Sequence, residues 1–305
     1  MTTSPRVSLN ARHRLLLTLL DSLGGRVGRL DFQKLLFLRC QEEGASAPYE
    51  FVPYKFGAFS FTSYADRRKL VERGLLDDEG DDWALTPEGK SAVKAARPYS
   101  GSVTKFVGAY RDLRGDALVA ETYRRFPYYA TRSTIAARVL HGDKRALAGI
   151  EAARPSSTRP GIATIGYEGL TLERYLNQLI DNGVTILCDV RRNAISRKYG
   201  FSKGTLSKAC EGIGLRYEHL PDLGIASEKR QSLDTQADYD ALFEEYERLH
   251  LPKQTAALAA IRSWVRDGER VALTCYEHLP QQCHRHCVGE ALEQKFGSGF
   301  APQHL

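Results

Sequence analysis

The sequence predicts an α/β protein whose C-terminal domain contains a doubly wound, mostly parallel sheet, preceded by an α+β domain and a basic helical connector. Two observations predict this class. After Pro160, short apolar runs alternate with amphipathic segments of helix length, and before Ala96 three helical patterns precede two short strand patterns. A chain of 305 residues is long enough for two separate cores. We therefore expect a domain at 1–96, a connector at 97–160 and a domain at 161–305.

The first domain has the element order of a winged helix-turn-helix. Three helical patterns precede two short strands around a polar turn, and Thr86-Pro87 is a typical start for a further helix. The expected helices and strands are 11–23, 31–44, 63–73, 75–76, 83–85 and 87–96. The stretch resembles winged-helix modules of bacterial proteins through the phrases QKLLFL, VPYKFG and GLL with LTPEG. These phrases are core and turn residues, so the resemblance implies a fold and no particular activity.

The polar turn of this predicted wing is acidic. Its carboxylates are Asp77, Asp78, Glu79, Asp81 and Asp82. Phosphate contacts supply much of the affinity for nucleic acid, so we expect this wing to repel a duplex. The third helix offers Arg67, Arg68, Lys69 and Arg73. Contact with DNA through that helix and a role as a protein-interaction or self-association module both stay open.

The net charge of +6 is concentrated in the connector. Residues 97–160 hold 12 Lys and Arg against five Asp and Glu, a net charge of +7, whereas 1–96 carry +1 and 161–305 carry −2. Aromatic residues alternate with arginines, a pattern that suits phosphates and unpaired bases. The candidate nucleic-acid-binding residues are Arg124, Arg125, Tyr128, Arg132 and Arg138. Alternatively, the aromatic side chains dock this segment onto a domain while its arginines face water.

In the C-terminal domain, polar residues follow each predicted strand. The strands are expected at 162–165, 184–190, 215–220 and 271–275, and helices near 171–182, 203–213, 238–250, 254–266 and 281–296. The residues at or just after their ends include Tyr167, Glu168, Asp189, Arg191, His219, Asp222, Cys275 and Glu277. Ligands of open α/β sheets bind at the carboxyl ends of the strands, so these four segments are expected to meet in one cleft.

The same phrases carry a family resemblance. TIGYEG at 164–169, CDVR at 188–191, YEHLPDLG at 217–224 and CYEHLPQQCHR at 275–285 resemble the domain-of-unknown-function family 488 over roughly 161–297. The resemblance implies a Rossmann-like fold and brings no established reaction. Tyr167 and Glu168 stand where many members have His and Ser, and Asn193-Ala194 stand where a proline commonly follows.

The chemistry is therefore argued from the side chains. A carboxylate pair beside a phosphate clamp suits cleavage of an N-glycosidic or phosphoester bond. The candidate catalytic residues are Asp189, Glu277, Tyr167 and Cys283. The candidate substrate- or phosphate-binding residues are Arg191, Arg197, His219, Cys275, His284 and Arg285. In the competing interpretation, Asp189 and Arg191 only pair with each other.

Cysteine chemistry is a further alternative. We expect the six cysteines to be reduced thiols. Cys283 lies beside His284 and Arg285 near a predicted helix start, a setting that lowers a thiol pKa and favours a nucleophile. A zinc site is also conceivable, because Cys275, Cys283 and Cys287 lie close in sequence to several histidines. Structural zinc sites usually combine a C-x2–4-C pair with a second pair of ligands, and the sequence has no second pair with this spacing. We therefore expect no metal and no cofactor.

These observations predict an enzyme, a hydrolase, that processes a nucleic acid or nucleotide. A nucleotide-sensing regulator without catalysis is the alternative, and a thiol-based transfer enzyme is a third possibility. The expected partners are a nucleic acid or nucleotide, and a protein partner or second copy at the winged-helix module. The early apolar run, Leu15–Leu20, is far shorter than a membrane span, so we expect no membrane partner and a cytoplasmic location.

Overall fold

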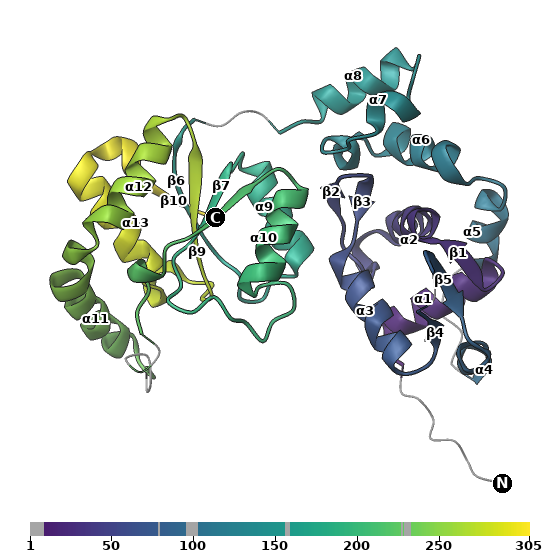
Figure 1. The fold of residues 1–305 in the computed structure, drawn as a ribbon, viewed down its shortest axis with the longest axis horizontal. Coiled ribbons are helices and arrows are strands. Elements are labelled where there is room, and N and C mark those ends of the chain that lie inside the picture. The colour runs from purple at the N-terminus through teal and green to yellow at the C-terminus, as the bar shows by residue number, and fades with distance from the viewer. Residues whose placement is uncertain (1–8, 79, 96–102, 156–158, 227, 229–232) are drawn as a thin grey trace, which may run out of the picture. The chain divides into compact units, whose positions relative to one another are not determined.

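The computed structural model describes residues 9–78, 80–95, 103–155, 159–226, 228 and 233–305. The chain separates into two compact units, Met1–Arg154 and Pro155–Leu305 (Figure 1). Each unit buries a hydrophobic cluster of its own.

The first unit combines helices with two small antiparallel sheets. Its helices are α1 (Ala11–Ser22), α2 (Arg29–Glu43), α3 (Phe61–Glu72), α4 (Pro87–Ala95), α5 (Val103–Tyr110), α6 (Gly115–Arg125), α7 (Ala136–Val139) and α8 (Lys144–Ala152). Its strands are β1 (Arg26–Gly28), β2 (Val52–Tyr54), β3 (Gly57–Phe59), β4 (Leu76–Asp77) and β5 (Asp82–Leu85). One sheet has the order β1-β5-β4, and β2 pairs with β3.

The core of this unit forms where α1 and α2 face β5. Leu15, Leu19 and Leu36 are fully buried there. The ring of Phe32 stacks on the ring of Trp83 with 4.4 Å between their centroids. Apolar residues at helical spacing on two helices therefore close over the antiparallel sheet, as the sequence pattern predicts.

Residues 103–154 fold onto the same unit. Phe106 of α5 belongs to the cluster that α1 and α2 form. The rings of Phe126 and Tyr129 lie edge-on to Phe37 of α2, with centroid distances of 5.1 and 4.7 Å. The described part of the expected connector is thus helical and packs within the first unit, because aromatic side chains of this segment pack against α2.

The second unit is built on a five-stranded, all-parallel sheet. Its strands are β6 (Gly161–Gly166), β7 (Ile186–Asp189), β8 (Arg216–His219), β9 (Arg270–Cys275) and β10 (Pro302–His304). Their order is β10-β6-β9-β7-β8, and all four neighbouring pairs are parallel. The predicted α/β class is confirmed for this unit, and β10 is an additional edge strand that the sequence analysis does not include.

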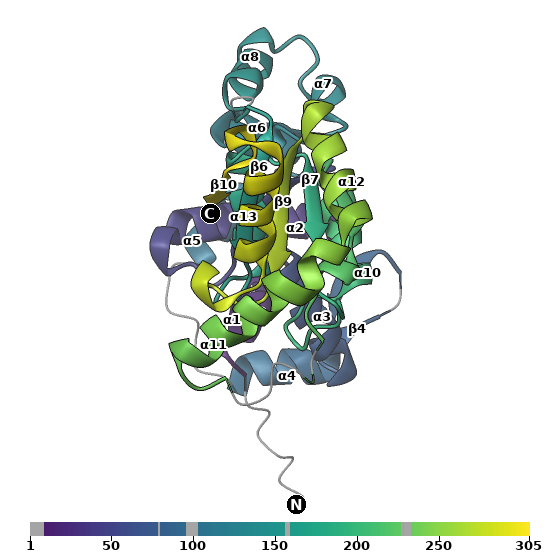
Figure 2. The same cartoon turned by 90° about the vertical axis from the view of Figure 1, so that its left-hand side faces the viewer.

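Helices cover both faces of this sheet (Figures 1 and 2). α9 (Leu172–Asp181) and α10 (Lys203–Gly212) lie on one face, while α12 (Thr255–Arg266) and α13 (Arg285–Phe296) lie on the other. α11 (Gln236–Glu245) precedes α12. α9 forms readily because Thr171 caps its first turn through the amide of Arg174 and its apolar residues share one face. Because helices cover both faces of the sheet, the buried strands are continuous apolar runs in the sequence.

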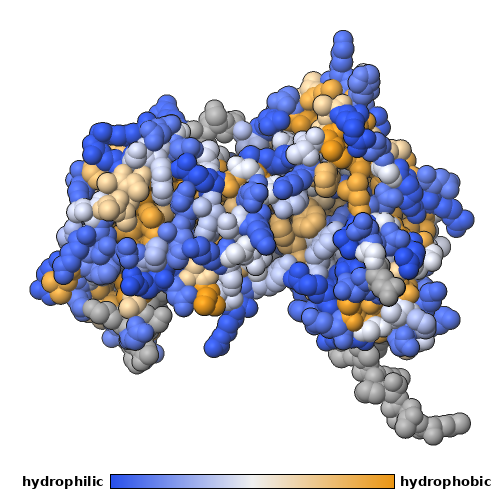
Figure 3. Space-filling model, in the orientation of Figure 1, coloured by the Kyte–Doolittle hydropathy of each residue, from blue (hydrophilic) through white to orange (hydrophobic). Residues whose placement is uncertain are grey.

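The visible surface of the second unit is mostly hydrophilic in Figure 3. A few large apolar side chains remain exposed, among them Ile195, Tyr276 and Leu279. Among the described residues, no helix has both the length and the apolar character needed to cross a bilayer.

Candidate functional site

The strand order creates a crevice on each side of β9. The loops after β6 and β7 lead to α9 and α10 on one face of the sheet, while the loop after β9 leads to α13 on the other. Neighbouring strands whose following loops lead to opposite faces of the sheet define a topological switch point, and open α/β sheets bind their ligands there. A cavity of about 810 Å³ opens there. The loops that follow the strands thus meet around one cavity, at the edge of the sheet where the sequence predicts a cleft.

The cavity brings together part of the predicted site. Its walls include five of the candidate residues, Tyr167, Arg191, Arg197, Cys275 and Glu277. Asp189, Cys283 and His284 lie behind this wall, buried, and His219 and Arg285 support neighbouring loops. The loops after β6, β7 and β9 therefore all contribute to one site, but not through every side chain that the sequence indicated.

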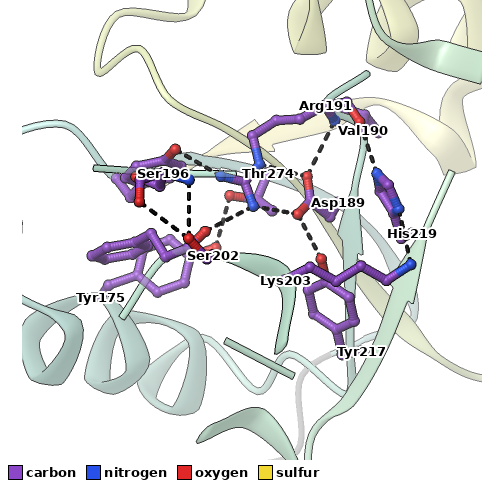
Figure 4. A network of polar contacts seen from close by, with 12 residues as sticks. Tyr175, Asp189, Val190, Arg191, Ser196, Ser202, Lys203, Tyr217, His219 and Thr274 are labelled. Carbon is purple, nitrogen blue, oxygen red and sulfur yellow. Dashed lines mark hydrogen bonds and ion pairs between the residues drawn. The ribbon is translucent and has the colours of Figure 1, made fainter. Parts of the chain in front are cut away.

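Asp189 belongs to a buried network of hydrogen bonds (Figure 4). It has no exposed surface, and it accepts hydrogen bonds from Arg191 Nε at 2.8 Å and from the Tyr217 hydroxyl at 2.6 Å. Arg191 also donates to the Tyr167 hydroxyl at 2.7 Å and to the Phe201 carbonyl at 3.0 Å. A carboxylate with these partners is not placed to accept a proton from substrate. The competing interpretation, in which Asp189 and Arg191 pair with each other, matches this geometry.

The charges of this network are fixed by its geometry. Burial by itself lowers the pKa of Arg191, but the hydrogen bonds and charge of Asp189 raise that pKa above its usual value. Burial, followed by the charge of Asp189, raises the pKa of Tyr217, so its hydroxyl keeps the proton that it donates. The ion pair therefore serves as a rigid wall of the cavity.

His219 supports the loop after β7. Its Nε2 donates to the Arg191 carbonyl at 2.9 Å, and the Lys203 ammonium lies 3.2 Å from its Nδ1 (Figure 4). Within the same loop, Ser202 accepts a hydrogen bond from the Ser196 amide at 3.0 Å. His219 thus holds the backbone that carries Arg191 and does not itself line the cavity.

At the end of β9, a thiol and a carboxylate share the cavity wall. Cys275 Sγ lies 3.3 Å from Glu277 Oε2 and 3.9 Å from His284 Nδ1. Cys283 is fully buried beside them. Burial, with a hydrogen bond from Cys275, raises the pKa of Cys283 well above its usual value. The predicted lowering of this pKa is wrong, because desolvation outweighs the nearby charge of Arg285.

The expected phosphate clamp of Arg191, Arg197 and Arg285 does not form. Arg191 is bound to Asp189, and the buried Arg285 donates to the carbonyls of Glu277 and His278 at 2.5 and 2.8 Å. α13 also begins at Arg285, later than the expected start near Gln281, because Pro280–Gln282 form a separate 3-10 turn. Arg191 and Arg197 both line the cavity, but of the three arginines only Arg197 is exposed.

The loops after β6 and β9 are bound closely together. The backbone amides of Tyr167 and Glu168 donate to the Tyr276 carbonyl at 3.1 and 2.9 Å, and the His278 amide donates to Glu168 Oε2 at 3.0 Å. A Cβ at Gly166 would lie 1.8 Å from the Glu277 carbonyl oxygen. Glycine at this position thus permits the approach that places Glu277.

The candidate nucleic-acid-binding residues all lie in the first unit. Arg124 pairs with Asp143 at 2.8 Å, and Arg138 pairs with Asp116. These contacts hold exposed arginines against their own unit and leave weaker attraction for an external phosphate.

The other three candidates make contacts of their own. Arg125 donates to the Tyr110 hydroxyl and lies 5.3 Å from the Phe126 ring. Tyr128 contacts the Tyr129 ring edge-on at 5.2 Å, and burial lowers the pKa of Arg132. The segment thus has aromatic side chains that pack against its own unit, as the alternative to nucleic-acid binding predicts, together with partly exposed cationic side chains.

A family profile described as "Domain of unknown function DUF488" matches residues 171–292. The match includes Asp189, Arg191, Cys275 and Glu277 and begins after Tyr167. It confirms the predicted resemblance over that range. Searches of curated proteins and of solved structures found no match.

Three contributors to the site are not among the residues that the sequence indicates. Tyr217 binds Asp189, Lys198 donates to the Tyr167 carbonyl at 2.8 Å, and Phe201 stacks on Tyr167 with 4.3 Å between centroids. A signal existed for Tyr217, because it lies two residues before His219 on β8 and so faces the same side of the sheet. Lys198 and Phe201 come from a loop whose path no periodicity reveals.

Proposed function

We propose that the second unit is a hydrolase that acts on a phosphate-bearing nucleotide or nucleic acid in the cavity beside β9. The observation that carries this proposal is the meeting of cationic side chains, an exposed aromatic ring and the Glu277 carboxylate around one cavity. Each of these three features suits a different part of a nucleotide.

The cavity wall favours an anionic, partly aromatic ligand. Three cationic side chains line this wall: Arg192 and Arg197, which are exposed, and Lys198. Guanidinium and ammonium groups bind phosphate oxygens through charge-assisted hydrogen bonds. Tyr276 is 44% exposed, and Ile195 is 77% exposed, so a nucleobase has an aromatic and an apolar surface to cover.

Glu277 is the proposed acid–base group. Asp189 is tied to Arg191, so Glu277 is the one of the two predicted catalytic carboxylates that lines the cavity, where Asp234 also lies. A carboxylate in that position activates water by taking a proton and then returns it to the leaving group. This exchange suits hydrolysis of an N-glycosidic or a phosphoester bond.

The test is a substrate panel. Full-length protein is incubated with nucleoside monophosphates and with single- and double-stranded DNA and RNA, and released base, phosphate and shortened strands are separated by chromatography. We expect turnover of at least one class, a loss of about 100-fold or more in Glu277→Gln, and unchanged binding in that variant.

Arg197→Ala and Arg266→Ala form a matched pair. Both remove an exposed arginine from the second unit, but Arg266 lies in the last turn of α12, outside the cavity wall. We expect weaker binding, by about tenfold, only in Arg197→Ala. Equal binding by both variants, or no turnover anywhere on the panel by folded protein, would contradict the proposal.

A binding module without catalysis is the second candidate. It is favoured by the buried Asp189 network, which makes a rigid wall and provides no free base. Under this alternative, the panel yields ligands without products, and Glu277→Gln binds them as wild type does.

We also propose that the first unit is a winged-helix module that contacts nucleic acid or a protein, a second copy included. The order α1, β1, α2, α3, β4, β5 supports this proposal. The wing carries less unpaired negative charge than its sequence indicates, since its four described carboxylates lie near arginines; Glu79 is outside the described residues. The pairs are Arg26–Asp77 (3.8 Å), Arg26–Asp82 (3.4 Å), Arg29–Asp81 (3.1 Å) and Arg67–Asp78 (3.1 Å).

The exposed residues Arg68, Lys69 and Arg73 on and beside α3 are the proposed contact surface. Fluorescence anisotropy with labelled DNA and RNA, and sedimentation of the free protein, test this role. We expect Lys69→Glu to lower nucleic-acid affinity or dissociate a dimer. If neither measurement detects an association in wild type, the proposed contact with nucleic acid and the proposed self-association are both wrong.

A further inference from the structure

Three metal-ligating side chains converge at the cavity wall: Cys275 lines it, and Cys283 and His284 lie behind it. The sulfur atoms of Cys275 and Cys283 and a ring nitrogen of His284 all lie within 4.8 Å of one another. Cys275 and Cys283 have no exposed surface, and His284 is 1% exposed. Two thiols and an imidazole that face one buried point form a donor set typical of zinc.

The orientation of His284 leaves the correct nitrogen available. Its Nε2 lies 3.0 Å from the Val190 carbonyl oxygen. A carbonyl only accepts, so Nε2 carries the proton, and Nδ1, which faces Cys275 Sγ at 3.9 Å, presents its lone pair. A backbone carbonyl that holds the second ring nitrogen of a ligating histidine is a regular feature of zinc sites.

The distances suit a tetrahedral ion after a small contraction. Zinc bonds of about 2.3 Å to sulfur and about 2.0 Å to nitrogen separate these atoms by about 3.6 Å in a tetrahedral site. The separation of 3.9 Å between Cys275 Sγ and His284 Nδ1 is close to this value. Cys275 and His284 therefore need to approach each other by only a few tenths of an ångström, and Cys283 Sγ already lies within 4.8 Å of both ligand atoms.

The surrounding loop is held in place before any ion binds. Arg285 donates to two carbonyls of the loop after β9, and Gly166 allows that loop to lie against the end of β6. Glu277 Oε2 lies 3.3 Å from Cys275 Sγ, on the cavity side of the cluster. The fourth position of an ion at this point is thus open toward Glu277 and the cavity.

A nucleophilic thiol explains less of this arrangement. Cys275 with His284 as its base would need only one sulfur, whereas Cys283 is also directed to the same point. Two sulfurs and one nitrogen are expected of a metal site.

We infer that Cys275, Cys283 and His284 hold a zinc ion whose open position faces Glu277 and the cavity. For its catalytic role, this inference rests on the proposed function. Water bound at the open position gives one proton to Glu277, and its oxygen bonds to the phosphorus or carbon under attack. The bond to the leaving group breaks, and Glu277 returns the proton to the leaving atom.

The first test is metal content. Full-length protein purified from zinc-supplemented cells is analysed by plasma mass spectrometry, and we expect about one zinc per chain. Cys275→Ser and Cys283→Ser should each lose most of it. Cys210→Ser, a buried cysteine of α10, and Glu277→Gln should keep it. Absence of zinc in wild type, or its retention in both Cys275→Ser and Cys283→Ser, overturns the inference.

Cys287→Ser separates this cluster from its neighbour. Glu247, His286 and Cys287 form a second group of potential ligands, in which Glu247 is exposed. We expect Cys287→Ser to retain the zinc. Loss of zinc in this variant alone would overturn the assignment to Cys275, Cys283 and His284.

Cobalt provides a test that does not depend on how the variants fold. Titration of Co²⁺ into zinc-free wild-type protein should give the visible bands of a tetrahedral ion and a near-ultraviolet band from thiolate ligands. A spectrum of octahedral cobalt without the thiolate band overturns the inference.

Activity distinguishes the two proposals from each other. Zinc bound at Cys275 and Cys283 without turnover on the substrate panel leaves the metal site standing and contradicts the proposed hydrolase. In the opposite outcome, zinc-free protein shows full turnover, and Cys275→Ser abolishes it. The hydrolase then stands, but Cys275 acts as a thiol nucleophile in place of the metal, and the inference is overturned.

Discussion

Lys34 shows how burial sets the chemistry of a single side chain. It is 1% exposed within the core of the first unit, and its ammonium donates to the Ala58 carbonyl at 2.9 Å. Burial lowers the pKa of Lys34 from 10.5 to about 7. Between these values the unfolded chain holds a proton that the folded chain has lost, so the free energy of unfolding rises with pH, by up to about 1.4 kcal/mol per pH unit.

This linkage predicts a specific pH profile. In a Trp264→Phe background, fluorescence of the buried Trp83 reports urea unfolding of the first unit. We expect its stability to increase between about pH 7 and about pH 9.5, and Lys34→Met to remove most of that increase. An unchanged slope in Lys34→Met would show that another group titrates.

The Asp189–Arg191 pair predicts an asymmetry between single and double variants. Asp189→Asn leaves the buried guanidinium of Arg191 without its counter-charge and should lower the free energy of unfolding by about 3 kcal/mol or more. Asp189→Leu combined with Arg191→Met should cost much less, because no charge remains buried. Urea unfolding followed by Trp264 fluorescence in a Trp83→Phe background measures both, and a double variant as unstable as the single one would contradict this account.

At the scale of elements, the loops after β6 and β9 depend on one close backbone approach. Gly166→Ala would place a Cβ 1.8 Å from the Glu277 carbonyl oxygen, so the loop that carries Glu277 must move. We expect Gly166→Ala to lower the melting temperature and to reduce zinc content and turnover together. Gly204→Ala in α10, where a Cβ meets nothing within 4 Å, is the control and should leave all three unchanged.

The helices and the four longer strands of the second unit could be predicted from their apolar periodicity. β10 could not, because Pro302–His304 is three residues long and carries no apolar alternation. The later start of α13 has a local cause, since Pro280 closes a separate turn. Short elements whose pairing comes from distant residues leave little trace in the sequence.

For the whole molecule, the two units each have a core, and this predicts that they fold independently. A fragment that begins at Pro155 should unfold in one cooperative transition and keep the zinc content of the full chain. Circular dichroism during urea titration, with plasma mass spectrometry, measures both properties. A fragment that is unfolded, or folded without zinc, would show that the site depends on the first unit.

The parallel α/β class and the edge of the sheet where polar residues gather follow from the sequence alone, because strand period and strand-end position are local properties. The sequence also indicated Tyr167, Arg191, Cys275 and Glu277 as members of the site. The roles of these residues depend on contacts that form in the folded chain. The placement of β9 between β6 and β7 buries Asp189 against Arg191 and directs Cys275, Cys283 and His284 to one point. The burial of a side chain and the distance to its partners depend on strand order. Strand order is set by contacts between residues that are far apart in the chain.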